Sequence, residues 1–476
     1  MKKYIVTIIT FAFSITFFAS CKKALTEKMY SAISPSNFYK TATDAEAALN
    51  GVFAVLPVDG YYMRTVFMIS DLSADIFQPN NANSPRIQLW RGEYTPQNSL
   101  LSVWWRKSYL LIKNANDVIT NVPNIEMDMV QKNNILGNAY FLRAMAHFDL
   151  VRCFGDVPLV AGKNGENELF PKRVSADSVY SKIIEDLKLA ETNCLHADQI
   201  PETKIGRVSS EAATAMLARV YLQRGGTSYA ASTDNQMALT QCNKVIAYST
   251  LHPNVISLLT NYKDVFDNDK KNGPESIFAI QFGEPPAQTS MTALMFDAPS
   301  LDGYGSFVAL NSFVNAFSAN DLRKAVTIGT FEDAHWWISK FHDPGVSLGS
   351  EGRVNWMIIR YADVLLMQSE ALNDITPSDA SKFDGINRIR TRAGLGSELL
   401  NFTNTPTPSD FVNALLKERL LELAIEGDRR YDLLRLKKYK EVKAAQGFSI
   451  DDNHLLYPIP QADRDVNPNL TQNLGY

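Results

Sequence analysis

The chain has 476 residues, of which 45% are hydrophobic and 11% aromatic, and its formal net charge is −4. A chain of this length and composition can fold into one large domain or two intergrown domains with a sizeable core. Its mildly acidic charge and the lack of a basic cluster argue against nucleic acid as a partner.

The first twenty residues have the pattern of a secretory signal peptide. Two lysines precede a mostly apolar run over 4–18, and two small residues end it. Cys21 follows directly, as in the lipobox of bacterial lipoproteins, where the cysteine becomes the acylated first residue of the mature chain. A transmembrane helix is the alternative, but the run is short and rich in Thr and Ser. We therefore predict a signal peptide at 1–20, lipidation at Cys21 and a tether over 21–40.

Long helical patterns alternate with short turns through the first half of the chain. Apolar residues recur at helical spacing in four segments, 103–122, 134–153, 176–193 and 209–224. Small residues such as Ala139 and Ala215 interleave there with aromatic ones, which lets neighbouring helices approach closely. These segments resemble tetratricopeptide helix pairs, although their spacing is longer than that motif's repeat. We therefore predict an all-α body built from degenerate tetratricopeptide-like pairs.

Two stretches of different composition interrupt the helical pattern. Residues 78–85 are rich in Asn and Pro. Residues 251–355 carry many Gly, Pro, Asp and Asn residues, with only short possible strands such as 276–282. Because binding residues usually lie on loops mounted on a rigid frame, we expect the functional site in these two stretches.

Aromatic side chains stand beside polar ones in both stretches. A flat aromatic face packs against the C–H groups of a sugar ring, and neighbouring polar side chains satisfy its hydroxyls. On this ground we predict a ligand-binding aromatic platform formed by Trp90, Trp336, Trp337, Tyr304, Asn81 and Arg91. The alternative for each aromatic residue is packing in the core. We assign three further tryptophans to packing, Trp104, Trp105 and Trp356.

Catalytic and metal motifs are weak by comparison. Residues 345–349 match G-x-S-x-G, with His454 downstream, but the pattern predicts neither the strand nor the helix that a nucleophile elbow needs. Residues 267–273 resemble a calcium loop, but Lys271 stands at a ligand position, so a solvated turn is the better interpretation. We expect no enzymatic activity, no cofactor and no metal.

Three cysteines follow the lipobox, namely Cys153, Cys194 and Cys242. Their spacing fits no zinc motif, and an odd number cannot close fully into disulfides. Buried thiols are the better interpretation, and one bridge between Cys194 and Cys242 is the alternative.

The last sixty residues carry the most informative pattern. Residues 418–435 read E-R-x-x-E-x-x-x-E-G-x-R-x-x-D-L-x-R, residues 457–460 read Y-P-I-P, and residues 467–476 read N-P-N-L-T-Q-N-L-G-Y. Apolar residues over 411–423 recur at helical spacing, which predicts a packed helix. Glu426 precedes Arg430 by four residues, which predicts a helical ion pair worth about 0.3–0.5 kcal/mol if exposed.

This signature resembles that of the SusD/RagB family, nutrient-capturing outer-membrane lipoproteins of Bacteroidetes. Two other segments fit the same family, R-Y-A-D-V-L-L-M at 360–367 and F-L-R-A through G-D-V-P-L at 141–159. The resemblance implies a helical body, a glycan or sometimes a peptide as ligand, and a SusC-like TonB-dependent transporter as partner. It also implies that an aromatic arc from the two loop-rich stretches holds the ligand.

Together these patterns predict a non-catalytic lipoprotein that captures an oligosaccharide or other nutrient at the outer-membrane surface and delivers it to the transporter. We expect an N-terminal helical part at 41–250, a loop-rich insertion carrying the ligand face at 251–355, and a C-terminal helical part at 356–476. Two alternatives belong to other classes of protein. One is a surface glycoside hydrolase, and the other is a helical scaffold that binds only protein.

Overall fold

The computed structural model describes residues 38–162, 169–283, 288–330, 335–347 and 349–476. The contacts within Thr41–Tyr476 make this segment one compact unit. The predicted signal peptide, Cys21 and most of the predicted tether lie outside the described residues. Among the residues described, none of the helices combines the length and the hydropathy needed to cross a bilayer.

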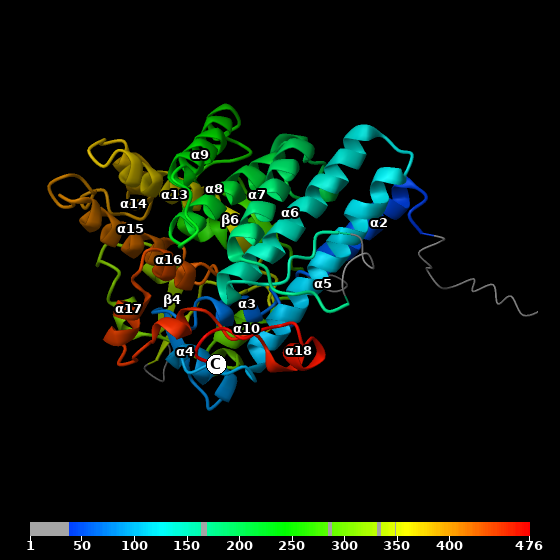
Figure 1. Cartoon of the computed structure of the whole chain (residues 1–476). Coiled ribbons are helices and arrows are strands. Elements are labelled where there is room, and N and C mark those ends of the chain that lie inside the picture. The colour runs from blue at the N-terminus through cyan, green and yellow to red at the C-terminus, as the bar shows by residue number, and fades with distance from the viewer. Residues whose placement is uncertain (1–37, 163–168, 284–287, 331–334, 348) are drawn as a thin grey trace, which may run out of the picture. The chain divides into compact units, whose positions relative to one another are not determined.

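The unit is mostly helical, with long helices before and after a series of short elements (Figure 1). The helices before the insertion are α2 (Ala42–Phe53), α3 (Thr65–Ile69), α4 (Ser84–Arg91), α5 (Ser99–Asn121), α6 (Met129–Phe154), α7 (Ala176–Asn193), α8 (Ser210–Gly225) and α9 (Asp234–Leu251). Those after it are α13 (Tyr361–Ile375), α14 (Lys382–Arg392), α15 (Pro408–Glu422), α16 (Arg429–Arg435), α17 (Tyr439–Ala445) and α18 (Gln461–Val466).

The remaining elements are short. They are β1 (Phe77–Pro79), β2 (Ser276–Ile280), α10 (Met291–Phe296), β3 (Phe307–Ala309), α11 (Asn311–Val314), α12 (Lys324–Thr327), β4 (Ile328–Thr330), β5 (Trp336–Ile338) and β6 (Trp356–Arg360). The prediction of a helical body with a few short strands is thereby confirmed.

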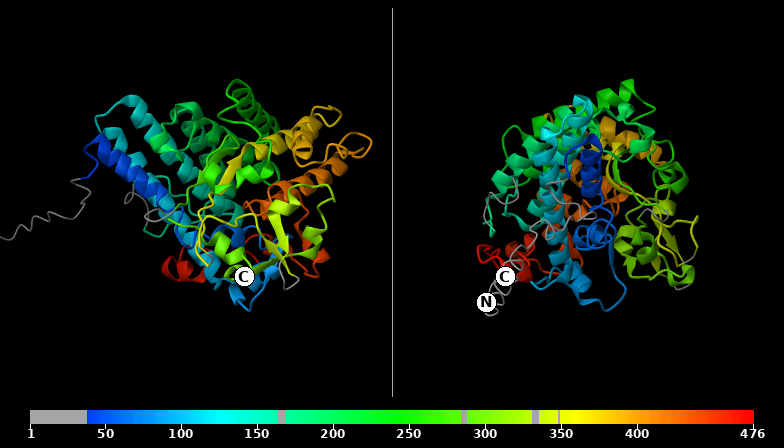
Figure 2. Two further views of the ribbon diagram at one scale, coloured as in Figure 1. Left: turned by 180° about the vertical axis from the view of Figure 1, so that it is seen from behind. Right: turned by 90° about the vertical axis from the view of Figure 1, so that its right-hand side faces the viewer.

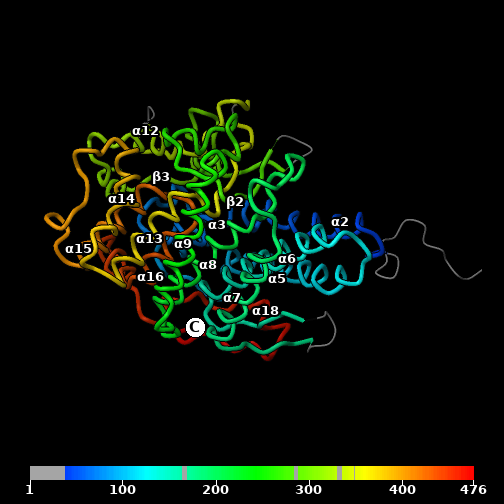
Figure 3. The backbone as a smooth tube through the Cα atoms, turned by 90° about the horizontal axis from the view of Figure 1, so that it is seen from above, coloured from blue at the N-terminus to red at the C-terminus, as the bar shows by residue number. Residues whose placement is uncertain are grey.

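Successive long helices pack against one another. The series runs from α5 through α6, α7, α8 and α9 to α13 and α14, and Figure 2 and Figure 3 show it from other sides. Small residues permit the close approach, because a Cβ added at Gly137 would lie 2.8 Å from the backbone nitrogen of Cys194. Helix α7 begins and ends where the pattern predicts. Helix α5 begins earlier, because the Asn98 side chain accepts a hydrogen bond from the Leu100 N–H (3.0 Å) and caps it.

The described strands form three antiparallel pairs, β1 with β3, β2 with β6, and β4 with β5. The first pair joins the two loop-rich stretches, with Phe77 opposite Ala309. Helix α13 begins at Tyr361, directly after the last residue of β6. Ile358 and Ile359 are β-branched, and their backbone pairs with β2, which favours the extended conformation.

Side chains that were predicted to pack do so. The three tryptophans assigned to packing are at most 4% exposed: Trp104, Trp105 and Trp356. The three cysteines after the lipobox are buried free thiols: Cys153, Cys194 and Cys242. The alternative of a bridge between Cys194 and Cys242 is therefore wrong.

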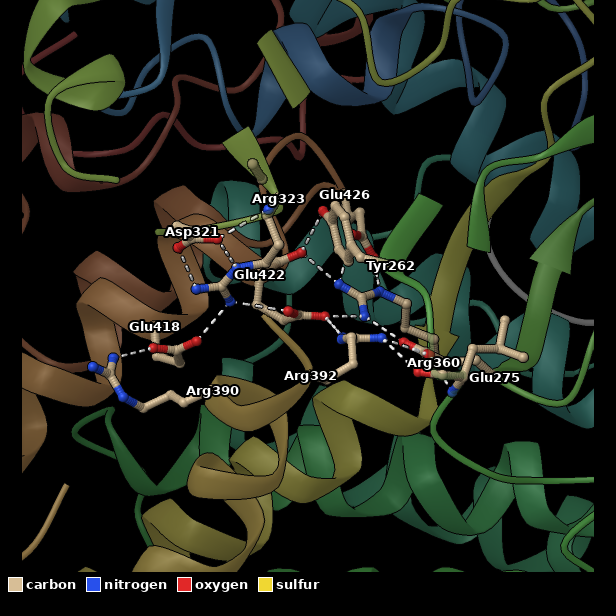
Figure 4. Close-up of polar contacts among 12 residues, drawn as sticks. Tyr262, Glu275, Asp321, Arg323, Arg360, Arg390, Arg392, Glu418, Glu422 and Glu426 are labelled. Carbon is tan, nitrogen blue, oxygen red and sulfur yellow. Dashed lines mark hydrogen bonds and ion pairs between the residues drawn. The ribbon is translucent and has the colours of Figure 1, made fainter. Parts of the chain in front are cut away.

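A buried network of ion pairs fastens the insertion to the C-terminal helices (Figure 4). Its carboxylates are Glu275, Asp321, Glu418, Glu422 and Glu426, and its cations are Arg323, Lys340, Arg360, Arg390 and Arg392. At the end of α15, the Glu422 carboxylate accepts hydrogen bonds from Arg323 (3.0 Å) and Arg360 (2.5 Å). A third arginine, Arg392, pairs with the same carboxylate. The charges in this network balance, which is the condition for burying them.

Glu426 has a different role from the one its spacing predicts. Helix α15 ends at Glu422, and Ile425 adopts a left-handed conformation with φ +59°, so Glu426 lies beyond the helix. Its carboxylate accepts hydrogen bonds from Lys340 (2.6 Å) and Arg360 (2.8 Å). The predicted pair with Arg430 is therefore wrong. A local helical periodicity could not show that the chain turns sharply at this point.

Neutralising Glu422 tests the importance of the network. Burial by itself would raise the pKa of this carboxyl, but the charges of Arg392, Arg360 and Arg323 outweigh burial and lower the pKa. A Glu422→Gln variant leaves three buried guanidinium groups short of a counter-charge. We expect it to lower the free energy of unfolding by about 3–5 kcal/mol, measured by guanidinium denaturation.

A matched control is Glu441→Gln on α17, where the carboxylate is 71% exposed and pairs only with Lys438 at the surface. We expect this variant to lie within about 0.5 kcal/mol of the wild type. Equal losses for both variants would contradict the structural role assigned to Glu422.

Candidate functional site

A hollow of about 540 Å³ lies where α4, β3, β5 and α17 meet, and we call it the aromatic hollow. Trp90 from α4 and Trp336 from β5 supply its aromatic surface, and Gln78, Asn311 and Ser312 supply polar groups. The remaining lining residues are Val308, Ala309, Leu310, His335, Ala445 and Gln446. Two tryptophans that are distant in the sequence thus face one space.

Local sequence explains how α4 presents Trp90. The helix starts at a capped end, where the Asn83 side chain accepts a hydrogen bond from the Arg86 N–H (3.3 Å) and Pro85 occupies the first turn. It ends at Gly92, which adopts the left-handed conformation (φ +78°) that favours glycine. Trp90 therefore lies in the last turn of a short helix with well-defined ends.

Interactions beneath α4 hold Trp90 in place. Its ring meets Phe448 edge to face, with the ring centroids 5.0 Å apart. The Lys443 ammonium donates hydrogen bonds to the Trp90 carbonyl and to the Gln446 side-chain oxygen, the latter at 2.9 Å. Lys443 is fully buried. Burial, followed by the charge of Arg430, lowers the pKa of Lys443 to about 7, although Asp75 acts in the opposite direction.

The alternation of a β-strand separates Trp336 from Trp337. Successive side chains of a strand point to opposite faces, and β5 is paired with β4 through Trp336 and Trp337. Trp336 is half-buried and faces the aromatic hollow, with the Lys324 ammonium 5.6 Å from its ring centroid. Trp337 is 0% exposed and packs with Ala298 and Val308. We therefore remove Trp337 from the candidate site.

The other predicted site residues do not line the aromatic hollow. Tyr304 is 58% exposed, and Asn81 and Arg91 are exposed. The Arg91 guanidinium lies 6.0 Å from the Trp90 ring centroid. Asn80 ties the Tyr304 loop to the first loop-rich stretch, because its side chain donates a hydrogen bond to the Gly305 carbonyl (3.1 Å).

Sequence reasoning missed several lining residues. Asn311 and Ser312 follow the strand β3, and a polar pair directly after an apolar run was the available signal. Gln446, which caps the end of α17, and Lys443, which supports Trp90 from beneath, had no local signal, because only the folded chain brings this short helix beside Trp90.

The described lining of the aromatic hollow combines aromatic, amide and hydroxyl groups. None of its described lining residues is Asp or Glu, whereas glycoside hydrolysis usually employs a pair of carboxyl groups. Asp333, which the sequence places near Trp336, lies outside the described residues. Across the described part of the chain, no group of three or more His, Cys, Asp or Glu side chains is arranged to hold a metal ion.

The fold and this hollow together define a helical scaffold that carries an open hollow with two tryptophans in its wall. Residues 317–476 match the model of the SusD family, and residues 25–222 match a model described as starch-binding associating with outer membrane. SusD-like protein P2 of Formosa agariphila is 29% identical over 99% of this chain and 99% of its own.

Solved structures agree in fold. A SusD superfamily protein from Parabacteroides distasonis superposes with a TM-score of 0.81 at 26% identity, covering 91% of this chain and 99% of that one. A laminarin binding SusD-like protein superposes with a TM-score of 0.77 at 25% identity, covering 92% of this chain and 100% of that one. The chain belongs to the SusD/RagB family.

The depressed pKa of Lys443 predicts a pH dependence of stability. Between pH 7 and the ordinary lysine value of 10.5, the unfolded chain binds this proton and the folded chain does not. The free energy of unfolding therefore rises with pH across this window. Between pH 7 and pH 9 we expect the free energy of unfolding of the wild type to rise on the order of 2 kcal/mol more than that of Lys443→Met. Urea titrations of both proteins at the two pH values measure this difference.

Lys440→Met on the same helix is the control, because Lys440 is exposed and pairs with Asp452 at the surface. Its free energy of unfolding should change between pH 7 and pH 9 by the same amount as that of the wild type. If the free energy of unfolding of Lys443→Met changed with pH as that of the wild type does, the pKa of Lys443 would not be lowered in the folded protein.

Proposed function

We propose that this protein is a non-catalytic binding lipoprotein that captures a glycan in the aromatic hollow and delivers it to a SusC-like TonB-dependent transporter. The observation that carries the proposal is the convergence of Trp90 and Trp336 on one open space with amide and hydroxyl groups beside them. Sugar rings offer flat C–H faces for the aromatic rings and hydroxyls for the polar groups.

The construction of the site supports recognition of an extended ligand. The hollow is open, and its two tryptophans come from separately anchored elements, α4 held by Lys443 and β5 held near Lys340. A rigid, preformed surface limits the ordering that binding requires, which favours affinity. The match to a model described as starch-binding supports a carbohydrate over a peptide.

Outer-membrane attachment and transfer to a transporter complete the proposal. Cys21 would carry the lipid anchor, and the tether would place the compact unit at the membrane surface. The description associating with outer membrane, matched over residues 25–222, supports this location. Family membership supports a SusC-like partner. Co-purification of a TonB-dependent barrel with the tagged protein is the direct measurement.

Removing either tryptophan from the aromatic hollow tests the ligand site. We expect Trp90→Ala and Trp336→Ala each to weaken glycan binding by at least about tenfold, because each removes a stacking surface at the centre of the site. Isothermal titration calorimetry against a panel of oligosaccharides and peptides measures the effect. Tyr229→Ala is the control, since Tyr229 is a partly exposed aromatic residue away from the hollow.

Each alternative function predicts a different result from the same panel. Binding of peptides alone would exclude a glycan ligand, and release of shorter sugars during incubation would indicate a glycoside hydrolase. Co-purification with a barrel, with no small ligand bound, would favour a scaffold. Unchanged affinity in both tryptophan variants would move the binding site elsewhere on the protein.

A further inference from the structure

A second hollow, of about 370 Å³, is lined by residues at the N-terminal end of α4, whereas Trp90 near the C-terminal end of this helix lines the aromatic hollow. We call this second hollow the arginine hollow, because Arg64 and Arg86 both line it. Its charged lining residues are Asp59, Arg64 and Arg86, and its apolar wall includes Met68 and Val103. The first turns of α4 and α5, which also border it, contain no acidic residue.

The charges of the arginine hollow do not balance. The Asp59 carboxylate is already taken, because both of its oxygens accept hydrogen bonds from Arg64 (2.6 and 2.7 Å). Arg86 has no carboxylate partner among the described residues, and its side chain is half-buried. Partial burial and the charge of Arg64 lower the pKa of Arg86 from its ordinary value. One cation is therefore held in a recess, beside another cation, without a counter-charge.

Packing fixes the direction in which this cation is presented. The Arg86 guanidinium lies over the ring of Phe307, with its central carbon 5.1 Å from the ring centroid. Phe307 is fully buried in β3, so the guanidinium covers the ring and keeps its edge N–H groups for another partner. A freely solvated surface arginine would have neither the stacking ring nor the recess.

Residues on one face of α4 contribute to both hollows. Arg86 precedes Trp90 by four residues, so the two side chains stand on the same face of the helix, about 6 Å apart along its axis. Strand β3 also joins them, since Phe307 supports Arg86 while Val308 and Ala309 line the aromatic hollow. An oligosaccharide stacked on Trp90 can therefore extend over Arg86.

We infer that the arginine hollow is a subsite for an anionic substituent of the glycan, a sulfate ester or a uronate carboxylate, bound by Arg86 with Arg64 beside it. This inference rests on the proposed function and names the substrate class of the same site as acidic glycans. Both substituents present coplanar or closely spaced anionic oxygens that match the guanidinium fork. The apolar wall lowers the local dielectric constant and strengthens this attraction.

Calorimetry with four polysaccharides tests the inference on the full chain. Laminarin and starch are neutral, polygalacturonate carries carboxylates, and carrageenan carries sulfate esters. We expect at least one acidic polysaccharide to bind more tightly than the neutral ones, and to lose affinity as the ionic strength rises. Binding of polygalacturonate would identify the substituent as a carboxylate, and binding of carrageenan would identify it as a sulfate ester.

Variants then assign that preference to the arginine hollow. We expect Arg86→Gln to weaken binding of the acidic polysaccharide about tenfold or more, and to leave the binding of any neutral one unchanged. Arg86→Lys keeps the charge but loses the fork, so it should recover part of the affinity. Lys188→Gln, which removes an exposed charge on α7, is the control for net charge, and thermal melting shows that each variant is folded.

The outcomes separate this inference from the proposed function. Trp90-dependent binding of neutral polysaccharides alone would overturn the anionic subsite and leave the proposed function standing. Equal losses of affinity for the acidic polysaccharide in Arg86→Gln and Lys188→Gln would also overturn the subsite. They would show that the preference for acidic polysaccharides comes from the net charge of the protein. Failure of all four polysaccharides to bind would overturn both.

Discussion

The structure depends above all on the balance of buried charge around Glu422. Three arginines from three segments meet this single carboxylate, and Glu426, Glu418 and Glu275 extend the network on either side. Burying these ions is costly, and only their close pairing offsets the cost. Because Lys340 joins the network through Glu426, the chain directly after β5 is tied to the chain directly after α15. The loop-rich insertion thus has a defined position on the helical scaffold.

The same principle extends through the rest of the C-terminal signature. Arg419 pairs with Asp363 and Asp432, and Arg435 pairs with Glu370 and Asp432, all of them buried. The charged positions of the signature therefore act on each other and on the neighbouring helices. None of the residues named here lines the aromatic hollow. The signature identifies the scaffold, and the choice of ligand is left to segments that the scaffold holds in place.

The candidate site is composite, because its two tryptophans come from elements that are anchored separately. Trp90 rests on a buried lysine and on Phe448 from the C-terminal region, whereas Trp336 rests on a strand of the insertion. Helix α4 presents an aromatic side chain near one end and, near the other, an arginine that has no carboxylate partner among the described residues.

The sequence by itself determined the helical scaffold and the family, because helical periodicity, small-residue packing and the C-terminal signature are all local patterns. It also singled out two tryptophans that line the aromatic hollow, Trp90 and Trp336. It could not determine that Trp337 faces inward beside Trp336, since a strand of three residues is too short to reveal its buried face. Nor could it show that Glu426 leaves the helix to meet Lys340, or that Lys443 lies beneath Trp90. Those contacts join residues far apart in the chain, so only the tertiary structure decided them.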